Sequence, residues 1–279
     1  MNALPPALEF LPLTVTHQSR WAMLRVAIIY RWRHGRWPRL KAPELFTEWV
    51  QWRKLNDRDH GLARLTDKLH SKSVAIGVLG EEMVVPTLWE GNYLPDEPPA
   101  RFPLILKANH GCRQNLVIRT AADWPAAKAV SRRWLNVAYG KWLDEWHYGA
   151  ARRTLLIEPL IGDGHTPPVD YKIYVFGGRA EIVQVHEDRA GRHRWAQIDR
   201  DWRRLSRRVS GVPRPVTLTA MLAAAEALAA GRDFLRVDFY EVDGQVLFGE
   251  FCLFPGSGLD PFDPIELDAE LGRKWANQR

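Results

Sequence analysis

The chain has 279 residues, of which 46% are hydrophobic, so it can bury a substantial core in one large domain or in two to three smaller ones. Its net charge of +6 comes mostly from arginines scattered along the sequence, which favours anionic small-molecule or glycan substrates over a dedicated nucleic-acid surface. The two cysteines form no C-x-x-C pair and the N-terminus shows no cleavable signal, so we expect a reduced, cytoplasmic protein without disulfides or a zinc site.

The N-terminal part of the chain, residues 1–62, is expected to be helical. Helices are predicted over residues 19–33 and 43–55, where apolar and tryptophan side chains recur at near-helical spacing. The most apolar early segment, residues 21–30, is too short to span a bilayer and contains Arg25. We therefore expect a buried helix here, with at most a peripheral membrane contact.

A further helix is predicted from Thr66 or Asp67, both capping residue types, to about Leu79. Lys68 lies in its first turn, where the helix dipole disfavours a cation. A lysine at this end is either an ordinary surface residue or one that a docked anion compensates.

Two short apolar strands are predicted next, over residues 102–107 and 116–118. The first ends in Lys107 and enters a loop with a single glycine, Gly111. A lysine in this place can meet phosphates while backbone N–H groups of the loop cover them, although one glycine makes the motif weak. Neither a P-loop nor a Rossmann fingerprint occurs in the sequence.

The middle of the chain alternates between helix and strand patterns. A helix is predicted over residues 124–146, and a strand over residues 154–161, which contain a Glu-Pro step. A hairpin is predicted from residues 170–176 and 181–185, turning at a Gly-Gly pair.

Two segments of contrasting composition follow this hairpin. Residues 188–208 are strongly basic and polar, so we expect a solvated, mobile loop. Residues 216–230 are rich in alanine and leucine and predict a helix that ends at Gly231.

The last motif, residues 233–260, is predicted to be a hairpin that turns at Asp243-Gly244. Asp238 lies five residues before Asp243, and Glu250 lies six after Gly244, so the hairpin brings the two carboxylates roughly opposite each other. Carboxylates among apolar residues are costly to desolvate unless a positive charge compensates them. The pair is therefore either outward-facing or a ligand set for Mg²⁺ or Mn²⁺.

The candidate residues occur in a fixed order along the chain: Asp67-Lys68, Lys107, Glu158, Asp170, Arg236-x-Asp238, Glu250 and Pro255-Gly256-Ser257-Gly258. This order resembles the ATP-grasp superfamily, whose ligases include D-alanine:D-alanine ligase. The phrases WRKLNDR, LTDKLHSK, LKANHGC, EWHYG, LIEPLIG, DYKIYVFGG and GEFCLFPGSGL resemble more closely the TupA-like ATP-grasp group, which is associated with cell-surface polysaccharide biosynthesis. The resemblance runs from about Lys41 to Trp275.

The resemblance implies an α+β, ATP-grasp fold in which two α+β subdomains grip a nucleotide between them. The helical extension over residues 1–62 would precede an ATP-grasp domain over residues 63–279. Within this domain, a small lid subdomain is expected at about 102–162 and a C-terminal metal-binding subdomain at about 163–279.

The resemblance also implies a role for individual residues. Those assigned to ATP are Lys68 and Lys107 for the α- and β-phosphates, Glu158 with the backbone of Pro159, Leu160 and Ile161 for adenine, and Asp170 for the ribose. Those assigned to the reaction are Asp238 and Glu250 as Mg²⁺ (or Mn²⁺) ligands, Arg236, Lys172 and Arg189 as catalytic residues, and Gly256 and Ser257 as substrate contacts.

Geometry expected from the strands supports part of this assignment, and one residue departs from it. Arg236 and Asp238 are two residues apart, as are Asp170 and Lys172, so each pair shares a face of its strand. Many ATP-grasp ligases have Asn where this chain has Cys252, and a neutral thiol is a poor ligand for a hard cation. A second metal ion would therefore need water or a backbone carbonyl there.

The function that the resemblance implies is that of an ATP-dependent carboxylate–amine ligase acting through an acyl phosphate. Its substrates would be a small-molecule or glycan acceptor with a carboxylate and an amine donor, on a cell-surface polysaccharide or its precursor, without nucleic acid. Two alternatives stay open: a kinase that phosphorylates a hydroxyl, and a nucleotide-binding scaffold that has lost catalysis, to which Cys252 points.

Overall fold

Four helices lead into the first sheet of the protein. The computed structural model describes residues 20–164, 168–187, 194–207 and 212–279. The helices are α1 (Arg20–His34), α2 (Phe46–Asn56), α3 (His60–Arg64) and α4 (Lys68–Leu79). The predicted N-terminal helices are confirmed within these residues, and residues 1–19 lie outside them. None of the described helices combines the length and the apolar character that a bilayer crossing requires.

The starts of two helices follow from their caps. Helix α2 begins three residues later than predicted because Leu45 is extended (φ −99°, ψ 148°), and the Glu48 carboxylate binds the N–H groups of Glu44 and Leu45. Helix α4 begins directly after Asp67, whose carboxylate accepts the N–H of His70 at 3.0 Å.

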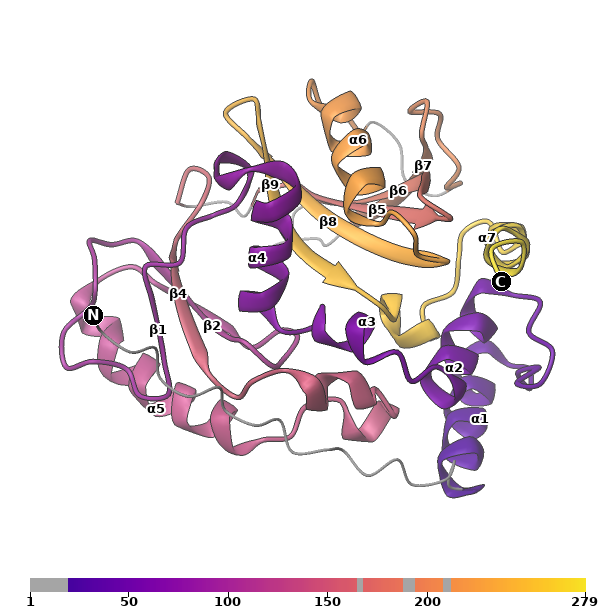
Figure 1. The fold of residues 1–279 in the computed structure, drawn as a ribbon, viewed down its shortest axis with the longest axis horizontal. Coiled ribbons are helices and arrows are strands. Elements are labelled where there is room, and N and C mark those ends of the chain that lie inside the picture. Colours follow the sequence, from indigo (N-terminus) through magenta and orange to yellow (C-terminus); the bar gives the residue numbers. More distant parts are fainter. Residues whose placement is uncertain (1–19, 165–167, 188–193, 208–211) are drawn as a thin grey trace, which may run out of the picture.

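A four-stranded antiparallel sheet forms the smaller half of the molecule (Figure 1). Its strands are β1 (Trp89–Gly91), β2 (Leu104–Ala108), β3 (Asn115–Ile118) and β4 (Leu155–Pro159), in the spatial order β1-β4-β2-β3. Helix α5 (Trp124–Asn136) covers one face, where Leu104, Leu106 and Ala127 are fully buried. The alternation along β2 therefore turns Lys107 toward the other face.

The helix predicted over residues 124–146 is wrong beyond Asn136. Val137 is extended, and Gly140 and Asp144 are left-handed, with φ of 82° and 57°, so a right-handed helix cannot pass through them. Two short 3-10 segments, Lys141–Leu143 and Trp146–Ala150, carry the chain to β4 instead.

A five-stranded antiparallel sheet forms the larger half, in the order β7-β6-β5-β8-β9. Its strands are β5 (Asp170–Phe176), β6 (Arg179–Glu187), β7 (Arg194–Asp199), β8 (Phe234–Val242) and β9 (Gln245–Cys252). Both predicted hairpins are confirmed, and Asp243 and Gly244 turn the second with φ of 51° and 74°, as a two-residue hairpin turn requires.

Strand β7 corrects the prediction of a loop over residues 188–208. Residues 188–193 lie outside the described part of the chain, but residues 194–199 pair with β6 along its free edge. Ala196 and Ile198 are buried while charged residues flank them, so the alternation of an edge strand is hidden in a basic composition.

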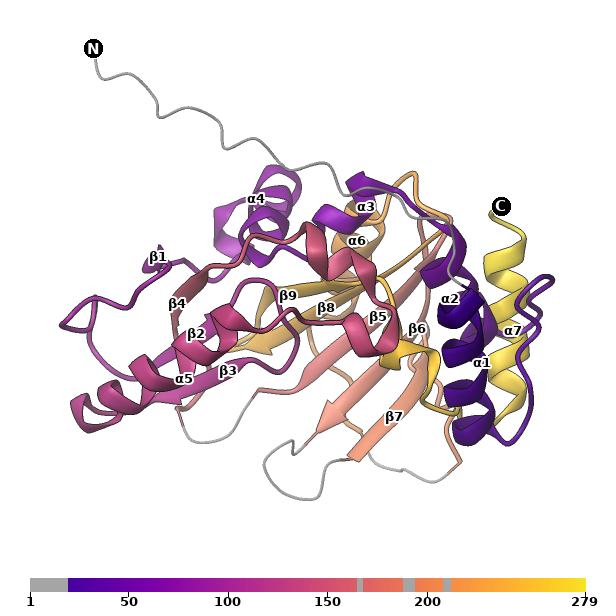
Figure 2. The same cartoon turned by 90° about the horizontal axis from the view of Figure 1, so that it is seen from below.

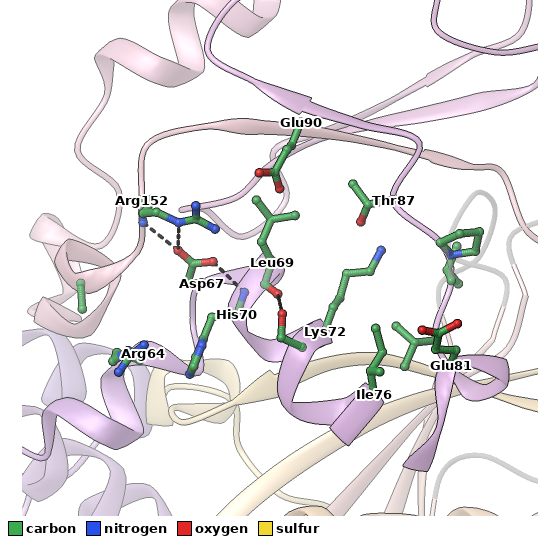
Figure 3. A pocket seen from close by; sticks show the side chains of 15 residues that line it. Arg64, Asp67, Leu69, His70, Lys72, Ile76, Glu81, Thr87, Glu90 and Arg152 are labelled. Carbon is green, nitrogen blue, oxygen red and sulfur yellow. Dashed lines mark hydrogen bonds and ion pairs between the residues drawn. The ribbon is translucent and has the colours of Figure 1, made fainter. Parts of the chain in front are cut away.

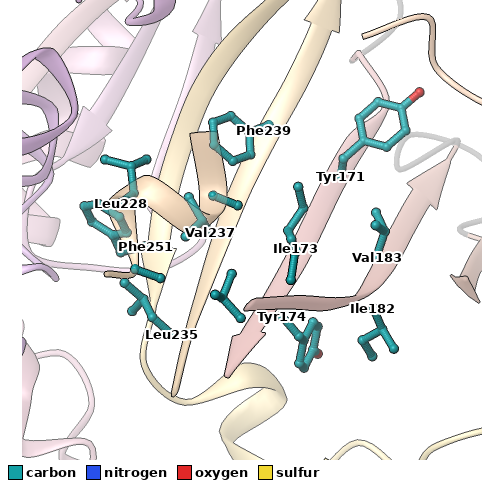
Figure 4. Packing of buried hydrophobic residues seen from close by; sticks show 14 of the residues in the cluster. Tyr171, Ile173, Tyr174, Ile182, Val183, Leu228, Leu235, Val237, Phe239 and Phe251 are labelled. Atoms are coloured by element: carbon teal, nitrogen blue, oxygen red, sulfur yellow. The ribbon is translucent and has the colours of Figure 1, made fainter. Parts of the chain in front are cut away.

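One face of the larger sheet is apolar and covered by helix α6 (Leu218–Leu228), which packs on β5, β6 and β8. Figure 4 shows Ile173, Val237 and Phe239 on this side, and all three have no exposed surface. Because successive strand residues point to opposite faces, the residues between them face away from α6.

That opposite face carries the charged residues of the sheet. Lys172 pairs with Asp238 between β5 and β8, and Asp238 pairs with Glu250 between β8 and β9. The next pair on the same face is Arg236 with Cys252. The predictions that Arg236 and Asp238 share a face, and that Asp238 and Glu250 lie opposite each other, are confirmed.

Helix α2 packs on one end of the larger sheet together with helix α7 (Glu266–Ala276), which the sequence did not predict, and α1 packs on α2 (Figure 2). The Phe46 ring lies 5.0 Å from that of Phe234, which lies 4.5 Å from that of Trp275. Arg53 is buried beneath them, 4.3 Å from the Trp275 ring, and donates to the carbonyl of Phe234. All strands of the smaller sheet come before residue 162 in the sequence, and all strands of the larger sheet come after it. The limits of the subdomains stay a prediction.

Candidate active site

The polar face of the larger sheet holds a buried network of two cations and two anions. The carboxylate of Asp238 accepts bonds from Arg236 Nε and NH2, both at 2.7 Å, and from Lys172 Nζ at 2.5 Å. Lys172 Nζ also lies 2.7 Å from the carboxylate of Asp170. Each of these side chains is more than nine-tenths buried. The structure therefore brings four predicted site residues into direct contact.

The charges in this network stabilise one another in their ionised forms. Burial raises the pKa of Asp238, but Arg236 and Lys172 outweigh it and hold that pKa below its usual value. Burial lowers the pKa of Lys172, but Asp238 and Asp170 outweigh it and raise that pKa. The network is thus charge-balanced, and of its two cations Arg236 also lines a small pocket.

Glu250 faces Asp238 across the hairpin, and the register then shifts at a β-bulge in which Gly249 of β9 has no partner residue. The two acids come from adjacent strands at one register position, and oxygen ligands of this kind fit Mg²⁺. No cluster of three or more His, Cys, Asp and Glu side chains suited to a metal ion exists among the described residues. A cation held by these two carboxylates would therefore complete its shell with water and phosphate oxygens.

Cys252 does not add a ligand to this pair. Burial raises the pKa of its thiol to about 12, although Arg236 opposes the shift. The sulfur is therefore protonated at neutral pH, and a neutral thiol binds hard cations poorly. The residues present fit one divalent cation better than two.

A second charged cluster lies on the smaller sheet. The Glu158 carboxylate accepts one bond from Lys107 Nζ and one from Lys72 Nζ, each at 2.5 Å. Burial raises the pKa of Glu158, but Lys107 and Lys72 outweigh it and hold that pKa low. The sequence reading gave no role to Lys72, although its place one helical turn after Lys68 puts both lysines on the same side of α4.

Lys68 connects the two sheets. Its Nζ donates to the carbonyl of Gly111 at 2.5 Å, in the loop that follows β2. Burial lowers the pKa of Lys68, and the positive charge of Lys107 lowers it further. The carboxylate of Glu250, in the larger sheet, raises it. Lys68 and Glu250 line one small pocket where α4 packs on β9, so one predicted phosphate lysine and one predicted metal ligand face the same space.

The predicted adenine-binding segment lies at the end of β4. Pro159 is the last residue of the strand and pairs with Leu104. The N–H of Leu160 donates to the carbonyl of Pro103 at 3.2 Å, and Leu160 and Ile161 are half-buried. The segment follows the end of an inner strand of the small sheet, and its role toward adenine stays a prediction. Arg189 lies outside the described residues.

The loop after β9 separates the two predicted substrate contacts. Gly256 and Ser257 are both left-handed, with φ of 52° and 58°. Gly256 is exposed and lines a small pocket beside Arg236, whereas Ser257 is buried with its hydroxyl 2.5 Å from Lys54 Nζ. Only Gly256 therefore faces the same space as Arg236.

The pocket beside Arg236 contains residues that the sequence reading did not assign. Its walls are formed by Phe46, Thr47, Tyr174, Gln184, His186, Trp195, Gln197, Arg236, Pro255, Gly256, Asp260, Pro261 and Phe262. Gln184 and His186 alternate on β6, as do Trp195 and Gln197 on β7, so the two-residue spacing of these polar residues was a signal that could have found them.

A larger cavity, of about 790 Å³, lies elsewhere, between α4, β1 and the segment around Arg152. Figure 3 shows Lys72 pointing into it, with Asp67 bonded to Arg152 at its side and Glu90 above. Neither Asp238 nor Glu250 lines this cavity. Lys72 lines it and also donates a hydrogen bond to Glu158.

One family model matches the chain, and several solved structures resemble it. The model of the family described as TupA-like ATPgrasp matches residues 48–276. No curated protein matches. Similar solved structures include a D-alanine–D-alanine ligase from Bacillus anthracis complexed with ATP, with 15% identity, a TM-score of 0.48, and coverage of 77% of this chain and 64% of that one.

Two further structures show a similar degree of likeness. An L-amino acid ligase from Bacillus licheniformis has 12% identity and a TM-score of 0.45, with 70% of this chain and 42% of that one covered. The VanG D-Ala:D-Ser ligase from Enterococcus faecalis has 11% identity and a TM-score of 0.48, with 77% and 61% covered. The chain thus spans less than two thirds of the length of each of these proteins.

Proposed function

The chain belongs to the TupA-like ATP-grasp family, and from this premise we propose that it is an ATP-dependent ligase that joins a carboxylate to an amine through an acyl phosphate. The observation that carries the proposal is the network of Asp170, Lys172, Arg236 and Asp238, which faces Glu250 and lies near Lys68. Phosphoryl transfer needs positioned cations and a carboxylate-held metal ion more than it needs a protein nucleophile.

In the first step, a carboxylate oxygen of the acceptor attacks the γ-phosphorus of ATP. The new O–P bond forms as the bond between the γ-phosphorus and the β-bridging oxygen breaks, which yields the acyl phosphate and ADP. Arg236 neutralises charge on the transferred group, while Asp238 and Glu250 would hold Mg²⁺ or Mn²⁺, which supplies further charge neutralisation at the phosphate oxygens.

Binding of the nucleotide requires two lysines to exchange partners. Lys107 binds Glu158 and Lys68 binds the Gly111 carbonyl, and we propose that both turn toward the α- and β-phosphates of ATP. Lys72 then keeps Glu158 paired, so its carboxylate is not left as an isolated buried charge.

In the second step, the nitrogen of the amine attacks the acyl carbon. A C–N bond forms, the C–O bond to phosphate breaks, and inorganic phosphate leaves while the amine loses a proton to solvent or phosphate. We assign the pocket beside Arg236 to the acid, because a guanidinium group and the exposed backbone of Gly256 suit a carboxylate.

The wider role that we propose is modification of a cell-surface polysaccharide or its precursor, with the reaction in the cytoplasm, where ATP is available. A uronic acid would fit the requirement for a carboxylate, and Trp195 in the pocket offers a flat apolar surface for a sugar ring.

The test is a measurement of ADP and free phosphate with MgATP, digalacturonate as the acid and a mixture of L-amino acids as amines. We expect both products to depend on the acid and the amine together, and a Lys107→Met variant to form neither. Phosphate retained on the sugar would show a kinase instead. Absence of nucleotide turnover and of nucleotide binding would overturn the proposal as a whole.

A further inference from the structure

Two side chains of helix α2 hold Ser257 in the loop that follows β9. Gln51 Nε2 donates to the carbonyl of Ser257 at 2.8 Å. Lys54 Nζ donates to the same carbonyl at 2.7 Å, to the Ser257 hydroxyl at 2.5 Å, and to Gln51 Oε1 at 3.2 Å. Every polar group that Ser257 turns toward α2 is therefore engaged by a residue about 200 positions earlier in the chain.

The next two carbonyls of the loop are bound in the same way. The carbonyl of Gly258 accepts from Gln51 Nε2 at 3.1 Å and lies 3.1 Å from His34 Nε2. The carbonyl of Leu259 accepts from Arg33 Nε at 2.9 Å. Three consecutive carbonyls thus point at side chains of α1 and α2, which fixes the orientation of the loop.

A lysine in this position has a large desolvation cost. Lys54 is only 2% exposed, and its three bonds go to neutral oxygens. Ser257 is a non-glycine residue with φ of 58°, a conformation that costs free energy unless its surroundings impose it. The desolvation of Lys54 and the unfavourable φ of Ser257 occur in the same contact. The contact therefore holds the loop in a backbone conformation that its own sequence does not favour.

We propose that Lys54 is a positioning residue of the acceptor site: by binding Ser257 it fixes the loop whose other side, at Gly256, lines the pocket beside Arg236. The proposal rests on the proposed function only in taking that pocket as the place of the acid. It gives the N-terminal helices a role in acceptor binding and makes Ser257 an anchor of the loop, with its hydroxyl turned to Lys54.

The charge of Lys54 provides a readout that a purely structural contact would not. Burial lowers the pKa of Lys54 to about 8, while Glu145 and Asp144 raise it. Glu145 also hydrogen-bonds the Ser257 side chain, and His147 interacts electrostatically with Lys54. Because Lys54 loses its proton as the pH rises through 8, its hold on Ser257 weakens above that pH, so the KM for the acid should rise there.

The experiment compares wild type with Lys54→Met and, as a matched control, Lys41→Met, since Lys41 is exposed. Amide hydrogen exchange of a peptide covering residues 255–260 is measured without ligand. We expect at least tenfold faster exchange in Lys54→Met, with the strands of both sheets unchanged and Lys41→Met equal to wild type. Unchanged exchange in this peptide, or equal acceleration throughout the chain, would overturn the proposal.

A second variant covers the case in which Lys54→Met does not fold. Ser257→Ala keeps Lys54 and removes only the hydroxyl, so a smaller acceleration confined to residues 255–260 is expected, and its absence would overturn the proposal. With digalacturonate as the acid, Lys54→Met should raise the KM for the acid at least tenfold and leave the KM for ATP within about twofold. The KM for the acid should then no longer rise above pH 8.

A wild-type protein that forms no ADP would refute the proposed function alone, because hydrogen exchange needs no nucleotide.

Discussion

The two faces of the five-stranded sheet are built by the same strands and serve opposite purposes. Toward α6, residues such as Val237 and Phe239 fill a core without exposed surface. Arg236 and Asp238, the neighbours of Val237 on β8, point to the opposite face and form a network of paired charges. A shift of one residue in a strand decides between core and site, because side chains alternate with a period of two.

The comparison shows why the sheet tolerates buried charges on one of its faces. The apolar face supplies the stability that fixes strand register, and register in turn places Lys172, Asp238 and Glu250 opposite one another. Substitutions on the apolar face should therefore act on folding, and substitutions on the charged face should act mainly on ligand binding and turnover. Four substitutions or conditions test this division.

The largest effect is expected from Val237→Asp, which puts an unpaired carboxylate into the core beneath α6. We expect a loss of more than about 4 kcal/mol of stability and a largely unfolded protein, since position 237 is fully buried in the apolar core. Circular dichroism and solubility measure the outcome, with Val237→Ala as the matched control, expected to fold. A folded Val237→Asp protein would break the distinction between the faces.

Asp238→Asn should act in the opposite way, on turnover with the fold retained. Removing the charge leaves Lys172 and Arg236 with one fewer anion, so we expect a stability loss of about 3 kcal/mol without unfolding, and a fall in turnover of at least about a hundredfold. Asp243→Asn, in the turn of the same hairpin, is the control and should change neither, because Asn tolerates its positive φ. Near-normal turnover in Asp238→Asn would refute the site.

Cys252→Asn is expected to have a smaller effect, on metal binding alone. An amide oxygen opposite Arg236 adds a hard ligand beside Glu250, so a second Mn²⁺ should bind about tenfold more tightly in the presence of nucleotide. Mn²⁺ titrations followed by electron paramagnetic resonance measure this, with Cys252→Ser as the control. Equal Mn²⁺ binding by all three proteins would show that this position lies outside the metal site.

The smallest effect concerns acid pH. The pKa of Asp238 is lower in the folded than in the unfolded state, so its contribution to stability is present above the unfolded value, about 3.9, and is lost as the pH falls through the folded value. The difference in Tm between wild type and Asp238→Asn should stay constant from pH 7 to about pH 4 and narrow below it. If the Tm difference already narrows between pH 7 and 5, the pH dependence of stability belongs to a group other than Asp238.

Much of the charged face could be predicted from the sequence because its signals are local. The Asp-Gly turn fixes the register of β8 on β9, and a spacing of two places Arg236 beside Asp238. The helix predicted past Asn136 failed because nothing in the apolar pattern reveals the left-handed Gly140 and Asp144. Strand β7 was missed because charged neighbours mask its alternation.

Contacts between distant segments could not be predicted at all. Lys54 and Ser257 are 203 residues apart, and a lysine in a helix is expected at the surface when only the sequence is known. Lys72 is similar, since only the folded chain shows that it shares Glu158 with Lys107. Such pairings depend on how elements pack, which periodicity within one element does not encode.

The central claim is that the charged face and the lysines opposite it form one Mg²⁺-dependent nucleotide site. Isothermal titration of the protein with AMP-PNP tests it directly, with and without Mg²⁺ and in a Lys68→Met/Lys107→Met variant. We predict one site in wild type that requires Mg²⁺, weakened at least about a hundredfold in the double variant, because two charge-assisted contacts are lost. Absence of binding to wild type, or equal affinity in the double variant, would contradict the account.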